Sequence, residues 1–270
     1  MYSPGRFILT VALALAGCAS PTIPATTPTT NSAELVLLST TATSRLLGEL
    51  TREYAVVRGG LVFSTGEGNH QSLMDRVRNA ETPAYFLSTH PPTESDLWAA
   101  PVALDSIAVI VNPANPIRDL SLDQLRSIYR GRIANWRELN AGEGPVTVFS
   151  REDGSGTRIE FENLLMGERQ TIQSAQVAPS SIAMLERIGA EVNGIGYVAG
   201  SMVADSVRPV AVDGVASTPE NIASSTYPLR TTVFIIGKAE PNGEFRMFVS
   251  WVQSPAGQAV VARRHAPLLP

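Results

Sequence analysis

Residues 150–157 carry the side chains that could do the most specific chemistry in this sequence. They read Ser-Arg-Glu-Asp-Gly-Ser-Gly-Thr, and they follow an apolar run, residues 146–149, that is typical of a buried strand. Arg151 supplies a permanent cation with a fork of N–H donors, and two glycines let the backbone approach a ligand. Ser155 and Thr157 add hydroxyl groups. Together these groups could hold an anion.

The residues after this turn predict a helix whose start faces the same place. Phe161 and Leu165 recur at helical spacing with charged residues around them. The first N–H groups of a helix lack intrahelical acceptors and carry partial positive charge, so those of Gly156 and Thr157 suit an anion. A simpler interpretation stays open, because Ser155 before a helix is also an ordinary N-cap that needs no ligand.

Composition and motifs exclude several classes of protein. A chain of 270 residues with 44% hydrophobic and 17% charged residues suits a globular protein of one or two lobes. A net charge of −4 without a Lys/Arg-rich run argues against nucleic-acid binding. Three scattered histidines and a single cysteine predict neither a metal centre nor an intrachain disulfide. No lysine follows Gly156 as a P-loop requires, and Ile159 replaces a glycine of the dinucleotide fingerprint, so no cofactor is expected.

The first 32 residues predict export and anchoring. Arg6 precedes an apolar run, residues 7–16, that is too short to span a bilayer and typical of a signal peptide over residues 1–18. The run ends in Leu-Ala-Gly-Cys, which resembles a bacterial lipoprotein box and would make Cys18 the lipid-modified residue. A plain secretory signal cut nearby is the alternative. Residues 19–32, rich in Pro, Thr and Ser, predict a flexible tether.

Three further apolar runs are each followed by hydroxyl-bearing residues and then by a helical pattern. This alternation of strands and helices predicts the α/β fold class. In open α/β sheets, ligands bind at the loops that follow the carboxyl ends of the strands. The hydroxyl residues in these loops are Thr40 and Thr41, Ser64 and Thr65, and Ser88 and Thr89.

Residues 151–158, Arg-Glu-Asp-Gly-Ser-Gly-Thr-Arg, resemble the phosphate-binding loop of the extracytoplasmic phosphate-binding proteins of ABC transporters (PstS-like). Other segments resemble the same family in the same order, and the resemblance covers nearly the whole mature chain. They are residues 107–116, residues 120–139 with Gly-x-Ile-x-Asn-Trp, and residues 194–197, 227–230 and 254–258.

The resemblance implies a two-lobed periplasmic-binding-protein-like fold of type II, with a ligand cleft between lobes joined by two crossing strands. The first crossing is expected between two strands around Asp105, and the second in residues 231–236. The lobe boundaries are predicted at residues 33–103 plus 234–270 for lobe 1 and residues 104–233 for lobe 2.

The resemblance also implies a ligand set for inorganic phosphate. Asp153 is expected to hold Arg151 in place rather than touch phosphate, because a carboxylate repels the anion. The residues implied to bind phosphate are Thr40, Thr41, Ser64, Thr65, Ser88, Thr89, Arg151, Ser155, Gly156 and Thr157.

The implied function is capture of phosphate outside the cytoplasm and its delivery to the permease subunits of an ABC transporter. The protein is expected to be a monomer, tethered to a bacterial membrane by its lipid anchor. A hydrolase is not expected, because Gly-x-Ser-x-Gly is absent and no histidine has an evident nucleophile partner.

The sequence departs from the family in the third loop. Ser88, Thr89 and His90 stand where the family often has a carboxylate. Such a carboxylate accepts a hydrogen bond from protonated phosphate and repels a fully ionised sulfate. Without it, a receptor or sensor for another tetrahedral oxyanion remains the alternative. Glu67 could replace the missing carboxylate, and His90 could instead add a cation.

Overall fold

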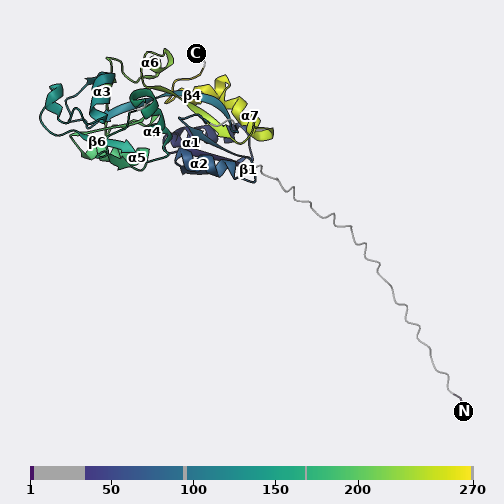
Figure 1. Cartoon of the computed structure of the whole chain (residues 1–270). Coiled ribbons are helices and arrows are strands. Elements are labelled where there is room, and N and C mark those ends of the chain that lie inside the picture. The colour runs from purple at the N-terminus through teal and green to yellow at the C-terminus, as the bar shows by residue number, and fades with distance from the viewer. Residues whose placement is uncertain (3–33, 94–95, 168, 269–270) are drawn as a thin grey trace. The chain divides into compact units, whose positions relative to one another are not determined.

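The computed structural model describes residues 1–2, 34–93, 96–167 and 169–268 (Figure 1). The chain separates into Met1–Asn31 and a compact unit, Ser32–Pro270. Apart from the first two residues, the predicted signal, the tether and Cys18 lie outside the described residues. No helix among the described residues is long and apolar enough to cross a membrane.

Short strands and helices alternate along this unit. The strands are β1 (Glu34–Thr40), β2 (Val62–Gly68), β3 (Ala84–Ser88), β4 (Trp98–Val111), β5 (Asp119–Leu120), β6 (Thr147–Arg151), β7 (Gln176–Ala178), β8 (Gly194–Ala199), β9 (Arg208–Pro209), β10 (Ala211–Val212) and β11 (Arg230–Gly237). The α-helices are α1 (Ser44–Val57), α2 (His70–Arg78), α3 (Leu122–Tyr129), α4 (Gly156–Phe161), α5 (Ser181–Ala190), α6 (Pro219–Ala223), α7 (Gly243–Val252) and α8 (Pro255–Val261). Single turns are η1 (Trp136–Leu139), η2 (Glu162–Met166, π-helical) and η3 (Gly200–Met202).

The main sheet has two parallel ends joined by antiparallel strands. Its strand order is β2-β1-β3-β11-β4-β8-β6-β7, and β9 also pairs with β4. At one end β1 is parallel to β2 and β3, and at the other β6 is parallel to β7 and β8. The antiparallel strands β11 and β4 lie between the two ends. The fold is therefore α/β with two lobes, as predicted, while the residue boundaries of the lobes stay a prediction.

Strand β4 connects the two lobes. Its residues from Trp98 to Ser106 pair with β11, and those from Ile107 to Val111 pair with β8. The prediction of two separate strands around Asp105 is therefore wrong. The strand continues because the buried Asp105 carboxylate accepts hydrogen bonds from the backbone N–H groups of Ser106 (2.7 Å) and Ser201 (3.1 Å) and from the Ser201 hydroxyl (2.7 Å).

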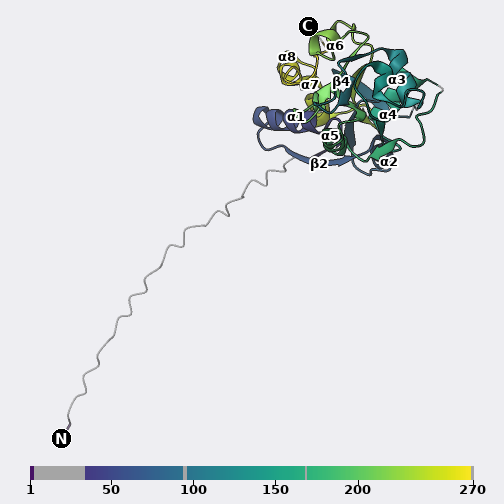
Figure 2. The same ribbon diagram turned by 90° about the vertical axis from the view of Figure 1, so that its left-hand side faces the viewer.

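Each half of the sheet is covered on both faces by helices with apolar stripes. In the first half, Leu50 of α1 and Phe248 of α7 belong to one buried cluster, and Leu73 of α2 belongs to a cluster on the opposite face. Helices α1, α7 and α8 contact one another and are seen together in Figure 2. In the second half, Ile128 of α3 and Ile188 of α5 belong to two different clusters. The parallel strands of the two halves run in opposite directions, so their carboxyl ends face each other near the middle of β4.

His265 packs beside the Asp105 junction. It is 2% exposed, and its Nε2 atom lies 3.4 Å from an Asp105 carboxylate oxygen. Burial lowers the pKa of His265 from its ordinary value of 6.5, although Asp105 and Glu49 act in the opposite direction and Arg264 acts with burial. The folded protein therefore holds this imidazole neutral at pH values where the unfolded chain would protonate it.

This shift predicts a loss of stability on acidification. Below about pH 6.5 the unfolded chain binds a proton at His265 that the folded protein does not, so the free energy of unfolding falls as the pH falls. Urea unfolding at about pH 7.5 and about pH 5 should show a smaller loss for His265→Gln than for the wild type. Equal losses in the two proteins would remove His265 from the pH response.

Candidate functional site

The loops after β1 and β6 meet the start of α5 in one hydrogen-bonded cluster. Arg151, the last residue of β6, donates from Nη2 to the Thr41 hydroxyl (3.1 Å) and from Nη1 to the Ser181 hydroxyl (3.1 Å). The Thr41 and Ser181 oxygens lie 3.4 Å apart, and the backbone N–H of Ser181 also donates to Thr41 (3.3 Å). Because Thr41 belongs to the first lobe and the other two to the second, the cluster spans the cleft.

The Arg151 guanidinium is buried and held by a carboxylate. Arg151 is 2% exposed, and it forms two hydrogen bonds with Glu152, from Nε (2.8 Å) and from Nη2 (2.9 Å). The backbone N–H of Arg151 donates to the Tyr197 hydroxyl (3.3 Å), and burial raises the pKa of Tyr197 to about 12. This tyrosine therefore stays neutral while it supports the end of β6. Such a two-point carboxylate contact fixes the plane of a guanidinium.

The predicted role of Asp153 as the residue that holds Arg151 differs from the structure. The Asp153 side chain is 96% exposed and accepts a hydrogen bond from Nη1 of Arg158 (2.6 Å). The same Nη1 atom donates to the backbone carbonyl of Arg151 (3.1 Å). Glu152 is the direct partner of Arg151, because it extends toward the buried guanidinium while the next residue points out of the turn toward solvent.

The turn before α4 brings this helix against the loops of the other lobe. A Cβ atom on Gly156 would lie 3.0 Å from the Ser88 hydroxyl, 3.3 Å from Cβ of His70 and 3.4 Å from Cβ of His90. The Ser155 side chain caps the helix by accepting from the N–H of Arg158 (3.4 Å). The N–H groups of Gly156 and Thr157, the first two helical residues, have no acceptors within the helix.

The loop after β3 supplies hydroxyl groups from the first lobe. Ser88 is fully buried, and its oxygen contacts Nδ1 of His70 (2.8 Å) and accepts from the backbone N–H of His90 (3.2 Å). The Thr89 hydroxyl is buried and has no hydrogen-bond partner among the described residues. On the neighbouring loop, the Thr40 hydroxyl lies 3.1 Å from that of Thr43. The structure thus brings Ser88 to the start of α4, whereas the Thr40 hydroxyl is engaged within its own loop.

Ser64 and Thr65 do not reach the cleft. A strand ending at Phe63 was expected, but β2 continues to Gly68, with Ser64 paired to Val36 and Thr65 paired to Leu37. Thr65 is exposed on this edge strand, and so is Glu67, the suggested substitute carboxylate. The glycines resemble a turn in the sequence, but parallel pairing with β1 keeps the segment extended. The placement of Ser64 and Thr65 in a ligand loop is therefore wrong.

The first residues of α2 lie where the loop of Ser64 and Thr65 was expected, next to the turn before α4. The backbone N–H of Gln71 donates to the carbonyl of Gly154 (3.1 Å), and the Asn69 side chain donates to the carbonyl of Asp153 (3.4 Å). His70, between them, is buried against Ser88. The sequence pattern does not indicate this place for His70, because its partner Ser88 lies 18 positions away.

Glu152 and Ser181 were also missed as members of the cluster. The signal for Ser181 was present, since Ser180 caps α5 by accepting from the N–H of Ala183 (3.0 Å) and Ser181 is the first residue of that helix. Its distance from Arg151 in the sequence concealed the contact. In the described residues, no three His, Cys, Asp or Glu side chains gather as metal ligands would.

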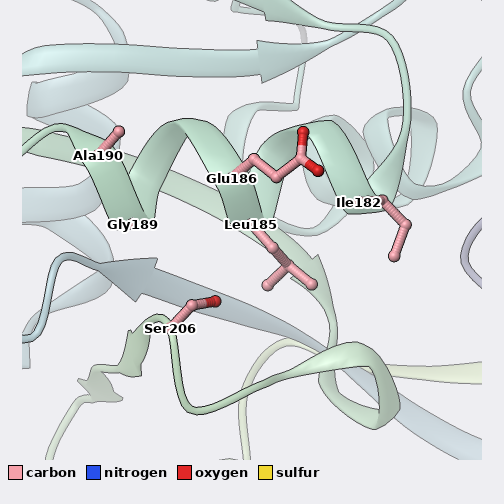
Figure 3. A pocket seen from close by; sticks show the side chains of 6 residues that line it. All are labelled: Ile182, Leu185, Glu186, Gly189, Ala190 and Ser206. Atoms are coloured by element: carbon pink, nitrogen blue, oxygen red, sulfur yellow. The ribbon is translucent and has the colours of Figure 1, made fainter.

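A pocket of about 590 Å³ lies along α5, beyond Ser181 (Figure 3). Figure 3 shows Leu185 and Glu186 on this helix and Ser206 on the segment facing it. Glu186 adds a negative charge to the lining of this pocket, and no Lys or Arg side chain lines it. The pocket therefore does not suit an anion. The lining residues are Ile182, Leu185, Glu186, Gly189, Ala190 and Ser206.

Comparisons with known proteins agree with this architecture. The chain is 31% identical over 155 residues to the phosphate-binding protein PstS of Bacillus subtilis, covering 57% of this chain and 51% of that protein. It is 27% identical over 224 residues to the phosphate-binding protein PstS of Pseudomonas aeruginosa, covering 74% of this chain and 68% of that protein. The first match therefore spans about half the length of the relative.

Solved structures show the same fold. One is a candidate phosphate ABC transporter substrate-binding protein from Clostridium perfringens with bound phosphate, with a TM-score of 0.83, 26% identity, and coverage of 88% of this chain and 100% of that chain. Another is an ABC-type phosphate transport receptor from Vibrio cholerae, with a TM-score of 0.69, 23% identity, and coverage of 87% and 100%. A family model described as the PBP superfamily domain matches residues 24–256. This chain belongs to the PBP superfamily.

Proposed function

We propose that this protein is an extracytoplasmic substrate-binding protein that captures inorganic phosphate between its lobes and delivers it to the permease of an ABC transporter. The observation that carries the proposal is the buried Arg151, which is tied to Thr41 across the cleft and lies beside the start of α4. A buried cation among hydroxyl and backbone N–H donors suits a tetrahedral oxyanion. The Clostridium perfringens structure with bound phosphate supports phosphate as the ligand.

The proposed ligand groups come from both lobes. Arg151 would supply the charge, and the N–H groups of Gly156 and Thr157 would add donors with the partial positive charge of a helix start. Ligation from both sides favours the state in which the lobes are together, so binding is coupled to hinge closure. The hydroxyl donors retained in the proposal are those of Thr41, Ser88, Thr89, Ser155 and Thr157, whereas the Thr40 hydroxyl is engaged by Thr43.

Binding without chemical turnover is part of the proposal. The curated relatives named above are phosphate-binding proteins. The same proposal makes the protein a monomer that works outside the cytoplasm.

Calorimetric titration of the unit Ser32–Pro270 tests the ligand. The protein is first unfolded and refolded to remove carried anion, and then titrated with phosphate and with sulfate at about pH 7. Phosphate binding without sulfate binding is expected for a phosphate receptor. Sulfate binding of similar strength would favour the alternative, a receptor for several tetrahedral oxyanions. That alternative is open because the loop of Ser88 has no carboxylate to repel sulfate. Heat from neither anion would contradict the proposal.

We also propose that Cys18 carries the lipid anchor. A lipidated cysteine after a short apolar run would hold the protein at a membrane surface through acyl chains. Cys18→Ser should shift the protein from the membrane fraction to the soluble fraction of the cells that express it, as measured by fractionation and immunoblotting. A Cys18→Ser protein that still sediments with membranes would contradict the anchor.

A further inference from the structure

A buried histidine–glutamate contact joins the two lobes beside the proposed anion site. His90 follows β3 in the first lobe, and Glu160 lies on α4 in the second. The Nδ1 atom of His90 and a carboxylate oxygen of Glu160 are 2.5 Å apart. Their side chains are only 8% and 15% exposed. Water therefore screens this pair poorly, and the interaction depends on both partners being present.

The position of Glu160 gives the pair a consequence for anion binding. Glu160 lies four residues after Gly156, so the two share a face of α4 about one turn apart. Helical side chains lean toward the N-terminus, and His90 itself packs against Gly156, with its Cβ 3.4 Å from where a Cβ of that glycine would be. An uncompensated carboxylate at this place would repel an anion held at the start of the helix.

The pair exists only while the lobes are together. Two neutral contacts accompany it across the same boundary, from Gln71 to the carbonyl of Gly154 and from Asn69 to the carbonyl of Asp153. Separation of the lobes would return both His90 and Glu160 to water. Closure therefore forms the contact and gives the buried Glu160 carboxylate a hydrogen-bond partner in one step.

We propose that His90 and Glu160 form a latch across the lobes that favours the closed state and pairs the Glu160 carboxylate, which lies on the helix that begins at the proposed anion site. The proposal rests on the proposed function for its ligand, inorganic phosphate. Both residues act by stabilising the closed state and by pairing the Glu160 carboxylate, and neither contacts the anion. In this arrangement His90 contacts Glu160 instead of adding a cation for the ligand.

A double-mutant cycle in phosphate titrations tests the latch. His90→Phe keeps a ring of similar size and leaves Glu160 unpaired, so we expect phosphate affinity to fall about tenfold or more. Glu160→Gln keeps an oxygen that accepts from His90 and removes the charge, so its affinity should stay within about threefold of the wild type. The double variant should recover only part of the lost affinity, because the unpaired Glu160 carboxylate is gone while the contact that favours closure is still missing.

The amide proton of Gln71 reports closure independently of affinity. Gln71 is the second residue of α2, so its N–H has no intrahelical acceptor and is protected by its bond to Gly154 across the cleft. NMR-detected hydrogen exchange of this amide should show about threefold or greater loss of protection in His90→Phe, with and without phosphate. As a control, Glu53→Gln removes an exposed ion pair with Arg263 within the first lobe and should change neither readout.

Three results would overturn the latch. One is a double variant whose loss of affinity equals the product of the two single losses. A second is unchanged Gln71 protection in His90→Phe, and a third is an equal loss of protection in Glu53→Gln. If the wild type binds no phosphate, the proposed function fails, and the exchange of Gln71 in the ligand-free proteins still decides whether the latch exists.

Discussion

Arg151→Met is expected to weaken phosphate binding by about two to four orders of magnitude. The substitution removes the buried cation and leaves Glu152, 19% exposed in its side chain, without its partner in the cleft. Loss of one partner from a buried charge contact costs about 3–5 kcal/mol, which is roughly 200- to 5000-fold in the dissociation constant. Calorimetric titration measures the loss, and thermal unfolding confirms that the variant is folded. Normal affinity in a folded Arg151→Met protein would mean that the anion binds elsewhere.

Two further variants separate the charge from its geometry. Arg151→Lys keeps a cation but loses the planar fork that reaches Glu152, Thr41 and Ser181 together, so its affinity should lie between those of the wild type and Arg151→Met. The double variant Arg151→Met/Glu152→Gln removes the unpaired carboxylate. If it recovers wild-type affinity, the loss came from repulsion by Glu152, and Arg151 itself contributes nothing to binding.

Local signals predicted the centre of this site. The expected strand, turn and helix around residues 150–161 correspond to β6, which ends at Arg151, and to α4, which begins at Gly156. An apolar run, a glycine turn and a capping serine lie within a few residues of one another. This short stretch of sequence therefore contains all the signals that specify the strand, the turn and the helix. The α/β fold class followed for the same reason, because each strand and helix has its own periodic pattern.

Errors arose where distant residues decide the structure. The extension of β2 to Gly68 depends on pairing with β1, and the unbroken β4 depends on Ser201 satisfying the carboxylate of Asp105. Ser181 reaches Thr41 across 140 positions of the sequence. No local pattern contains these partners. The error in the partner of Arg151, for which Asp153 was predicted and Glu152 is observed, has another cause. The two acidic residues are adjacent in a turn, and only the direction of the backbone decides which side chain reaches Arg151.

Asp105→Ala is expected to cause the largest loss of stability among substitutions outside the cleft. The carboxylate is 1% exposed and accepts three hydrogen bonds, two from backbone N–H groups and one from the Ser201 hydroxyl. Each buried donor left without an acceptor costs about 1–3 kcal/mol, so we expect a fall of about 3 kcal/mol or more in the free energy of unfolding. Urea unfolding at about pH 7.5 measures it.

Matched variants show whether the junction of the lobes is the cause. Ser201→Ala removes only the hydroxyl bond and should cost about 1 kcal/mol. Asp105→Asn keeps an oxygen at the place where both N–H groups donate, so its cost should be intermediate. A loss below about 1 kcal/mol for Asp105→Ala would mean that the hydrogen bonds of β4 with β11 and β8 hold the crossing strand by themselves. The expected order instead makes the buried carboxylate the group that allows one strand to serve both lobes, and hence the fixed point about which the cleft closes.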